Sequence, residues 1–222
     1  MLTKITQLVE QDDYDDLPQS GHIVGERFEY QYFFGGIRLL KVSLVPHNKI
    51  YAKSMSSLSS EPQVKEALGL TNDQTSLEGT IDFIEFILEQ ERLGKQYSRV
   101  ILDENGNLIG VITLKDIDDI NSTCHIGTWI GHHYWGKGYN ALAKSEILYI
   151  AFTVLDLEYV FAGAKLSNIR SQKAQENLPY IRIGVQSEFP EEHRKLESQV
   201  NSPCILNVIE REMFLKWYSD NK

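Results

Sequence analysis

The sequence predicts a mixed α/β domain, and three patterns support this prediction. Segments of strand character flank turns rich in glycine and asparagine, helical periodicity dominates the region between them, and the second half alternates strand, loop, helix and strand. The chain has 222 residues and is 42% hydrophobic, which supplies enough apolar surface for a sizeable core. We expect residues 1–36 to form an acidic leader and hairpin extension, and residues 37–222 to form the domain.

The N-terminal extension is predicted from charge and alternation. Residues 1–20 are polar and contain a cluster of acidic side chains, so we interpret them as a solvent-exposed leader. In residues 22–34 aromatic side chains alternate with charged and polar ones, which is typical of a strand. The Gly35-Gly36 pair then favours a turn, and residues 37–45 are expected to return as the second strand of a hairpin.

The next region predicts helices and then an antiparallel hairpin. Residues 46–94 show helical periodicity and predict two or three helices, with a Thr75-Ser76 start signal before the clearest one. The expected apolar stripe of that helix consists of Leu77, Ile81, Ile84 and Leu88. Residues 98–104 and 108–115 are expected to pair across an Asn105-Gly106-Asn107 turn, because these turn residues tolerate positive φ angles.

The second half of the chain predicts a crossover between two parallel strands. A strand over 124–130 leads into a glycine-rich loop and a helix, and a further strand follows. This order favours a parallel pair joined by the helix. The remaining expected elements are a loop over 131–138, helices over 139–155, 168–177 and 210–218, and strands over 158–166, 180–185 and 204–209.

Composition and charge limit the classes of function. The formal net charge of −9 disfavours nucleic-acid binding, which depends on basic surface, and weakly favours a cationic partner. No stretch has the roughly 18 apolar residues of a membrane span, and the first residues lack a signal peptide's apolar core. We therefore expect a cytoplasmic protein with no membrane partner. Cys124 and Cys204 have no neighbouring ligand cluster, so we expect buried free thiols and no metal site.

The segment from Ile126 to Asn140 carries the strongest functional signal. A strand runs into a turn that contains Gly136 and Gly138, and a helix begins at once, so backbone N–H groups and the positive end of a helix meet at one point. Such a point binds anions, and glycine allows a pyrophosphate to approach the backbone. The residues after Gly138 fit neither the dinucleotide fingerprint nor the nucleoside triphosphate loop.

This segment resembles the acetyl-CoA motif of the GNAT acetyltransferase superfamily, in its ribosomal-protein and small-amine branch. The runs Ile126-Gly127-Thr128-Trp129-Ile130-Gly131 and Tyr134-Trp135-Gly136-Lys137-Gly138-Tyr139 are similar to the family pattern, with His133 where relatives often have Arg or Gln. The resemblance implies a central, mostly antiparallel sheet with splayed parallel strands and flanking helices. It also implies acetyl-CoA as co-substrate, contacted by Trp129, Ile130, Tyr134, Trp135, Gly136, Lys137, Gly138, Tyr139 and Asn140.

A second match follows one helix later. The residues Asn168, Ser171, Glu176 and Leu178 coincide with the family's Asn-x-x-Ser and the Glu-Lys-Leu-Gly-Phe that follows it. The resemblance implies that Asn168 orients the pantetheine arm. Many relatives carry an acidic tyrosine at the position of Gln175, so Ser171 becomes the candidate that protonates the leaving thiolate. Helix capping is the alternative role for Asn168 and Ser171. Tyr180 is a further candidate acid, with packing in a strand as its alternative.

Acyl transfer to an amine requires a base, because only the neutral amine carries the lone pair that attacks. His125 is the candidate, since it directly precedes the motif at a place where relatives often carry Glu, and its ordinary pKa suits proton acceptance at neutral pH. A structural histidine is the alternative. Asp116, Asp118 and Asp119 are substitutes, unless they form only a solvated turn. The resemblance also implies an oxyanion donor, a backbone N–H near Trp129 or Ile130.

The expected function is acetyl transfer from acetyl-CoA to a primary amine by direct attack, without a metal. The acceptor is left open between a protein N-terminus and a small-molecule amine. Residues 46–95 resemble the family's variable acceptor-binding helices and do not decide between them. Two alternatives remain: a non-catalytic acyl-CoA-binding module, and a protein-interaction module whose N-terminal hairpin pairs with a partner or with a second copy in a homodimer.

Overall fold

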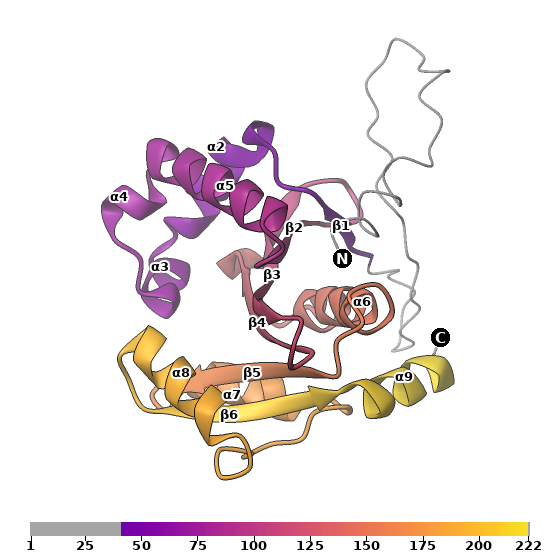
Figure 1. Ribbon diagram of the computed structural model, residues 1–222. Coiled ribbons are helices and arrows are strands. Elements are labelled where there is room, and N and C mark those ends of the chain that lie inside the picture. Colours follow the sequence, from indigo (N-terminus) through magenta and orange to yellow (C-terminus); the bar gives the residue numbers. More distant parts are fainter. Residues whose placement is uncertain (1–40, 222) are drawn as a thin grey trace.

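A computed structural model describes residues 41–221, which form a six-stranded sheet flanked by helices (Figure 1). The predicted leader and the first strand of the predicted hairpin lie outside these residues; of the second strand, predicted over 37–45, residues Ser43–Val45 form β1, which pairs with β2. The strands lie in the sheet in chain order, and every neighbouring pair is antiparallel except β4 and β5, which are parallel. The predicted mixed α/β fold with a mostly antiparallel sheet is therefore confirmed.

The elements agree closely with most of the predicted ranges, although residues 46–94 form four α-helices and a short 3-10 helix where two or three helices were predicted. The strands are β1 (Ser43–Val45), β2 (Tyr97–Leu102), β3 (Leu108–Asp118), β4 (Thr123–Ile130), β5 (Tyr159–Lys165) and β6 (Cys204–Glu210). The helices are η1 (Lys49–Tyr51), α2 (Ala52–Ser59), α3 (Pro62–Leu68), α4 (Asn72–Thr75), α5 (Leu77–Arg92), η2 (His132–Tyr134), α6 (Tyr139–Thr153), α7 (Ile169–Glu176), α8 (Pro190–Val200) and α9 (Arg211–Asp220). The predicted turn between β2 and β3 has Gly106 at a φ of +79°.

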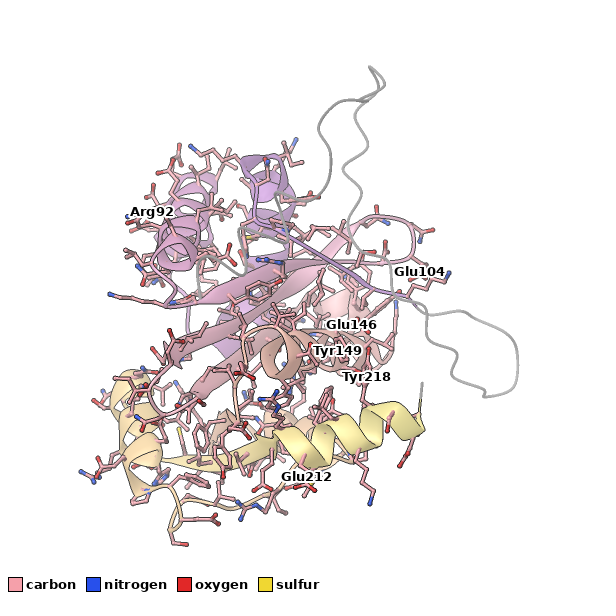
Figure 2. The ribbon with its side chains drawn as sticks, turned by 45° about the vertical axis from the view of Figure 1, so that its right-hand side comes forward. Arg92, Glu104, Glu146, Tyr149, Glu212 and Tyr218 are labelled. Atoms are coloured by element: carbon pink, nitrogen blue, oxygen red, sulfur yellow. The ribbon has the colours of Figure 1, made fainter. Side chains whose placement is uncertain are left out.

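Helices cover both faces of the sheet. One face packs against α6 and α9 through the largest core cluster, which includes Phe152 and Phe214. The opposite face is covered by α2 and α5 over the first strands and by α8 over β5 and β6. Figure 1 shows α2 to α5 and α8 to the left of the sheet, and α6 and α9 to its right. Tyr149 of α6 and Tyr218 of α9 stack with ring centroids 4.7 Å apart, which joins these two helices (Figure 2).

The predicted stripe of α5 is partly wrong. The helix begins after Ser76, whose side chain accepts from the Gly79 N–H, as the start signal indicated. Its buried residues are Thr80, Ile84 and Ile87, whereas Leu77 and Leu88 are 46% and 41% exposed. Thr80 tolerates burial because its hydroxyl donates to the Ser76 carbonyl at 2.7 Å. The face of α5 that packs on the sheet is therefore the one with Thr80, Ile84 and Ile87.

Two predictions in the C-terminal third need correction. Residues 180–185 are not a strand, since only Arg182 forms an isolated bridge, to Val208. Gly184 has a φ of +72°, which bends the chain out of the extended conformation. The helix α8 was not predicted at all, because its sequence is mostly charged and buries only Leu196. Pro190 and the acidic pair Glu191 and Glu192 are helix start signals that the sequence prediction did not use.

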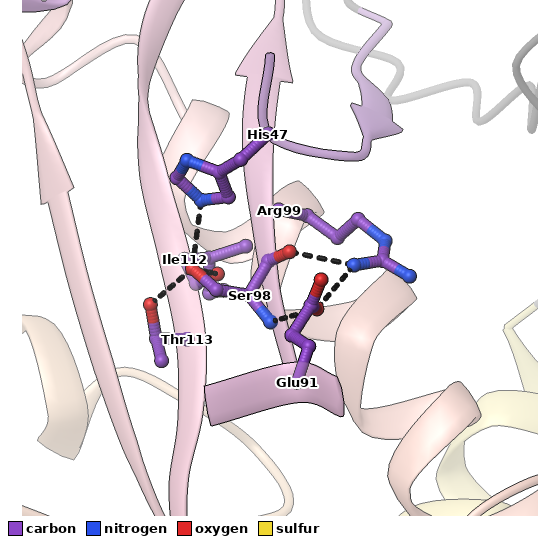
Figure 3. A network of polar contacts seen from close by, with 6 residues as sticks. All are labelled: His47, Glu91, Ser98, Arg99, Ile112 and Thr113. Atoms are coloured by element: carbon purple, nitrogen blue, oxygen red, sulfur yellow. Dashed lines mark hydrogen bonds and ion pairs between the residues drawn. The ribbon is translucent and has the colours of Figure 1, made fainter. Parts of the chain in front are cut away.

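His47 lies just after β1 and is buried, and Figure 3 shows its ring turned towards Ser98 of β2. Its Nε2 is 2.9 Å from Ser98 Oγ, and its ring meets Phe83 edge to face with centroids 5.8 Å apart. Burial is the main cause that lowers the pKa of His47 from 6.5 to about 4, and the positive charge of Arg99 adds to it. The folded protein therefore holds this ring neutral in mild acid.

We expect His47 to make the fold sensitive to acid. The folded-state pKa lies below the unfolded value, so the stabilisation is present above pH 6.5 and is lost as the pH falls towards 4. The full loss corresponds to roughly 3 kcal/mol of unfolding free energy. Urea unfolding of His47→Gln between these pH values should show a shallower decline than the wild type. His133→Gln, at an exposed histidine, is the control, and equal declines in all three proteins would refute the assignment.

Candidate active site

The sheet opens between β4 and β5. The two strands pair in parallel over four residue pairs, from Thr123 with Tyr159 to Ile126 with Ala162. Beyond Ile126, β4 continues along β3, while β5 continues along β6 to Lys165. The two strands part after Ile126 and Ala162, in agreement with the splayed parallel strands that the family resemblance implies. Backbone groups of β4 beyond this point therefore face an opening in place of a neighbouring strand.

The orientation of these backbone groups follows from the β3–β4 ladder. The Gly131 N–H donates to the Ile109 carbonyl at 2.8 Å, so the alternation of an antiparallel pair also turns the Trp129 N–H towards β3. The N–H groups of Thr128 and Ile130 consequently point towards the opening. Of the two residues that the sequence offered as oxyanion donors, Ile130 has the required orientation and Trp129 does not. Sequence reasoning missed Thr128.

The loop after β4 and the first turn of α6 border this opening. Gly136 and Gly138 have φ angles of +73° and +92°, so both positions favour glycine. Gly138 is the N-cap of α6, whose first N–H groups have no partner within the helix. Lys137 is exposed, with its ammonium 5.5 Å from the centroid of the Tyr134 ring. The positive end of a helix and a cation thus lie where the sequence predicted an anion site.

Trp135 connects the two sides of the opening. Its indole Nε1 donates to the Ile130 carbonyl at 2.6 Å, which satisfies the carbonyl of the last β4 residue, a group that points away from β3. The guanidinium carbon of Arg170, in the first turn of α7, lies 3.2 Å from the centroid of a Trp135 ring. This cation–π contact joins the loop after β4 to the helix after β5. It places a positive charge that sequence reasoning did not assign to the site.

Glu61, the N-cap of α3, fixes the start of the same loop. Its carboxylate accepts from the His132 N–H at 2.6 Å and lies 2.9 Å from His133 Nδ1. A Cβ added to Gly131 would lie 2.9 Å from a methyl carbon of Leu58, so α2 also packs closely here. The side chain of His133, at the position of the family's Arg or Gln, is therefore engaged with the start of α3.

His125 lies on the face of β4 that α8 covers. Its ring is 2% exposed, and its centroid is 5.4 Å from that of Phe161. The His125 Nε2 is 2.6 Å from Glu192 Oε2 of α8. Burial lowers the pKa of His125 more than the Glu192 carboxylate raises it, so the ring is neutral at neutral pH. If Nε2 carries the proton that Glu192 accepts, Nδ1 is the basic nitrogen.

Asn168 and Ser171 lie at the start of α7, across the opening from α6. The Asn168 Oδ1 accepts from the Ser171 N–H at 3.0 Å, so Asn168 is the N-cap, as the capping alternative held. This bond uses only the amide oxygen and leaves the Nδ2 group as a donor for another partner. Ser171 Oγ lies 3.4 Å from Gln175 Nε2. The cap thus leaves polar atoms of both residues available for chemistry.

A sequence profile of the acetyltransferase (GNAT) domain matches residues 41–179, more than half of the chain. The chain belongs to the GNAT acetyltransferase family. The uncharacterized N-acetyltransferase p20 of Bacillus licheniformis is 27% identical over 155 residues, which cover 69% of this chain and 84% of that relative. This GNAT protein is accordingly an acyl-CoA-dependent N-acetyltransferase, as the sequence predicted.

Two solved structures share the fold of this GNAT domain. Mycobacterium smegmatis RimJ in complex with CoA-disulfide has a TM-score of 0.63 at 16% identity, covering 78% of this chain and 83% of that one. Spermidine N-acetyltransferase from Vibrio cholerae, in complex with CoA and spermine, has a TM-score of 0.60 at 14% identity, covering 78% of this chain and 98% of that one. Both were solved with CoA or a CoA derivative, which supports acetyl-CoA as the co-substrate of the family.

The opening of this GNAT domain fits a polar ligand. Thr128 Oγ1 on β4 and Asn140 Oδ1 in the first turn of α6 are buried, and neither has a hydrogen-bond partner within residues 41–221. Buried polar atoms in native proteins are nearly always paired, so both oxygens are suited to bind a ligand. Asn140 was among the predicted contacts for acetyl-CoA, whereas Thr128 was not.

The predicted cofactor residues do not all present their side chains to the opening. The Tyr139 side chain lies in the core and donates to Glu104 Oε2 at 2.8 Å, so only its backbone borders the opening. Trp129 is on the opposite face, against the cluster beneath α2 and α5. The other predicted residues come from the loop, the end of β4 and the start of α7, namely Ile130, Tyr134, Trp135, Gly136, Lys137, Gly138, Asn140, Asn168 and Ser171.

The substitute candidates have structural partners. Asp118 Oδ1 accepts from the N–H groups of Ile120 and Asn121, which shapes the turn between β3 and β4. Asp116 Oδ2 accepts from Gln199 Nε2 of α8 at 2.9 Å. Tyr180 is 1% exposed, with its ring 4.5 Å from that of Trp217. These contacts favour the turn and packing interpretations.

The described residues offer neither a group of metal ligands nor a membrane-crossing helix. Between residues 41 and 221, no three His, Cys, Asp or Glu side chains gather in a group that could hold a metal ion. In the same part of the chain, no helix combines the length and the hydropathy needed to cross a membrane. Cys124 and Cys204 are buried and free, as predicted.

Proposed function

We propose that this protein binds acetyl-CoA in the opening between β4 and β5 and transfers the acetyl group to a primary amine that approaches from the His125 face. One observation carries the proposal. The strands part after Ile126 and Ala162, which turns the N–H groups of Thr128 and Ile130 towards the opening. These donors lie at the end of the same strand that leads into the anion-binding loop and α6.

The cofactor side is formed by backbone and by cations. The turn at Gly136 and Gly138 and the N-terminus of α6 hold the pyrophosphate, because they present N–H groups and a positive dipole. Arg170 adds a positive charge from the other side of the opening. The Asn168 amide donates to the pantetheine arm. Bound in this way, acetyl-CoA supplies the activated thioester.

The acceptor side is formed by one row of β4. His125, Gly127 and Trp129 share a face, and nothing lies within 4 Å of a Cβ built on Gly127. The missing side chain exposes the strand backbone between the two rings. An amine can therefore reach the strand backbone at Gly127, two residues from the buried His125.

The residues then have distinct roles in the reaction. His125 takes up the proton that the amine nitrogen loses as it bonds to the thioester carbon, directly or through water. The N–H groups of Thr128 and Ile130 donate to the carbonyl oxygen as negative charge develops. Ser171 gives its proton to the sulfur as the carbon–sulfur bond breaks, and water restores the serine proton.

The acceptor is proposed to be a small-molecule amine or a protein N-terminus, and the net charge of −9 favours a cationic one. The test is release of CoA thiol from acetyl-CoA across polyamines, amino sugars, amino acids and peptides with free N-termini. Turnover with at least one amine, together with its acetylated product, is the expected result. Binding of CoA without turnover on every amine would favour the non-catalytic module instead.

A further inference from the structure

A chain of buried side-chain amides lies behind Ser171. Gln175, one turn further along α7, is 4% exposed, and Asn207 of β6 is fully buried. The Asn207 Nδ2 donates to Gln175 Oε1 at 2.7 Å. The Gln175 Nε2 in turn lies 3.1 Å from the Gly163 carbonyl and 3.4 Å from Ser171 Oγ. At the far end, the Gly184 N–H donates to Asn207 Oδ1 at 2.9 Å.

Backbone groups at both ends fix the direction of these hydrogen bonds. The Gly184 N–H can only donate, so the atom of Asn207 that faces it must be the oxygen, and Nδ2 must face Gln175. Gln175 therefore meets Asn207 with its own oxygen and turns its NH₂ group towards Ser171. The Gly163 carbonyl can only accept, which requires the same orientation. Reversing either amide would set two acceptors or two donors against each other in the interior.

This direction determines what the Ser171 hydroxyl can do. Because an amide N–H faces its oxygen, the hydroxyl accepts on the α7 side and cannot donate to Gln175 Nε2. The Ser171 backbone N–H is already bound to Asn168 Oδ1. Within residues 41–221, the Ser171 hydroxyl donates to no carbonyl or carboxylate oxygen. Its single proton is therefore available to a group outside the helix.

We propose that Gln175 and Asn207 are positioning residues that act through Ser171. They hold its oxygen as an acceptor, so that its proton points to the departing sulfur. This inference rests on the proposed function, in which Ser171 protonates the thiolate. As the carbon–sulfur bond breaks, the electron pair stays on sulfur, the Ser171 proton moves to it, and water returns a proton to the serine oxygen.

Gln175→Glu tests the direction of the hydrogen bond with almost no change of shape. The carboxylate has no N–H, so Ser171 must donate to it and the proton is withdrawn from the sulfur. We expect kcat to fall about 10- to 100-fold, as in Ser171→Ala, at the low end for general acid assistance. CoA affinity should stay within about 2-fold, because backbone groups hold the pyrophosphate.

A double-mutant cycle separates positioning from structural damage. If Gln175 acts only through Ser171, Gln175→Glu should lower kcat by less than about 2-fold once Ser171 is alanine. Gln172→Glu is the matched control on the same helix, since Gln172 Nε2 also donates to carbonyls, those of Lys165 and Leu166. It should retain kcat. Asn207→Asp is the second variant, because it reverses the Gln175 amide without touching α7.

Each outcome decides one question. Absence of turnover with every amine in the wild type refutes the proposed function itself. Turnover in the wild type with full kcat in Ser171→Ala, or in both Gln175→Glu and Asn207→Asp, leaves the function standing and overturns the positioning role. If the kcat losses of Ser171→Ala and Gln175→Glu multiply in the double mutant and its Tm falls, the positioning role is also overturned. The buried amides then contribute to stability alone.

Discussion

Gly138→Val is expected to abolish CoA binding and leave the fold intact. Gly138 is the N-cap of α6 and has a φ of +92°, a conformation that a β-branched residue adopts only with strain. The loop must shift to relieve this strain, and the N–H groups around the pyrophosphate position then move with it. The valine side chain also holds a phosphate away from the backbone. Calorimetric titration with CoA should show at least about a 100-fold loss of affinity.

Gly94→Val is the matched control. Gly94 follows α5 with a φ of +70°, and a Cβ there meets nothing within 4 Å, so the substitution introduces similar backbone strain at a distant turn. Both variants should lose a similar amount of thermal stability, roughly 1–3 kcal/mol. Only Gly138→Val should lose CoA. Equal CoA affinity in the two variants would move the phosphate site elsewhere.

His125→Ala is expected to lower kcat by about 10²- to 10³-fold at neutral pH, the range of a general base. Burial lowers the pKa of His125, so its basic form persists at neutral pH and is lost only in acid. The loss of rate should therefore shrink as the pH rises, because free amine becomes abundant without the base. A pH–rate profile of kcat for wild type and variant measures this difference directly.

Glu192 offers the companion experiments for this prediction. Glu192→Gln keeps a hydrogen-bond acceptor for His125 Nε2 but removes the charge that raises the pKa of the ring. The acidic limb of the pH–rate profile of Glu192→Gln should move to lower pH, and its kcat should fall less than that of His125→Ala. The double variant His125→Ala and Glu192→Ala also removes the half-buried carboxylate beside the new alanine, and it should remain slow at neutral pH. A profile of unchanged height and shape in His125→Ala would remove this residue from the mechanism.

The fold was predictable where the sequence has strong local signals. The β2–β3 hairpin follows from its glycine turn, and the β4–α6–β5 crossover follows from strand, glycine loop and apolar helix. Residues 180–185 have strand-like composition, but Gly184 at positive φ limits their pairing to one bridge. The helix α8 was missed because its sequence is mostly charged, although Pro190 marks its start and Leu196 and Val200 pack against the core cluster under it.

The candidate site was predictable only in its contiguous parts. The loop and the start of α7 are short segments, so their residues could be named from the two motifs. The places of three other residues in the site could not be predicted. Glu192 lies on α8, which was not predicted, Arg170 reaches the site through a tertiary contact with Trp135, and the orientation of Thr128 depends on strand register. The amide chain from Asn207 to Ser171 joins residues far apart in sequence. A single sequence, considered alone, gives no signal for pairs of residues that are distant along the chain.

The chain-ordered sheet has a consequence for cohesion and folding. Residues 41–130 contain β1 to β4, and residues 159–221 contain β5 and β6, so within the sheet the two contiguous parts meet along the four parallel pairs, while the core under α6 and α9 spans both. The short run of parallel pairs is a line along which the sheet has few hydrogen bonds to break when one part opens. A molecule bound across this line contacts both parts and adds its binding free energy to the coupling between them. Bound acetyl-CoA would then hold the two parts of the sheet together, and hydrogen exchange of the backbone amides in β5 and β6 would slow in its presence.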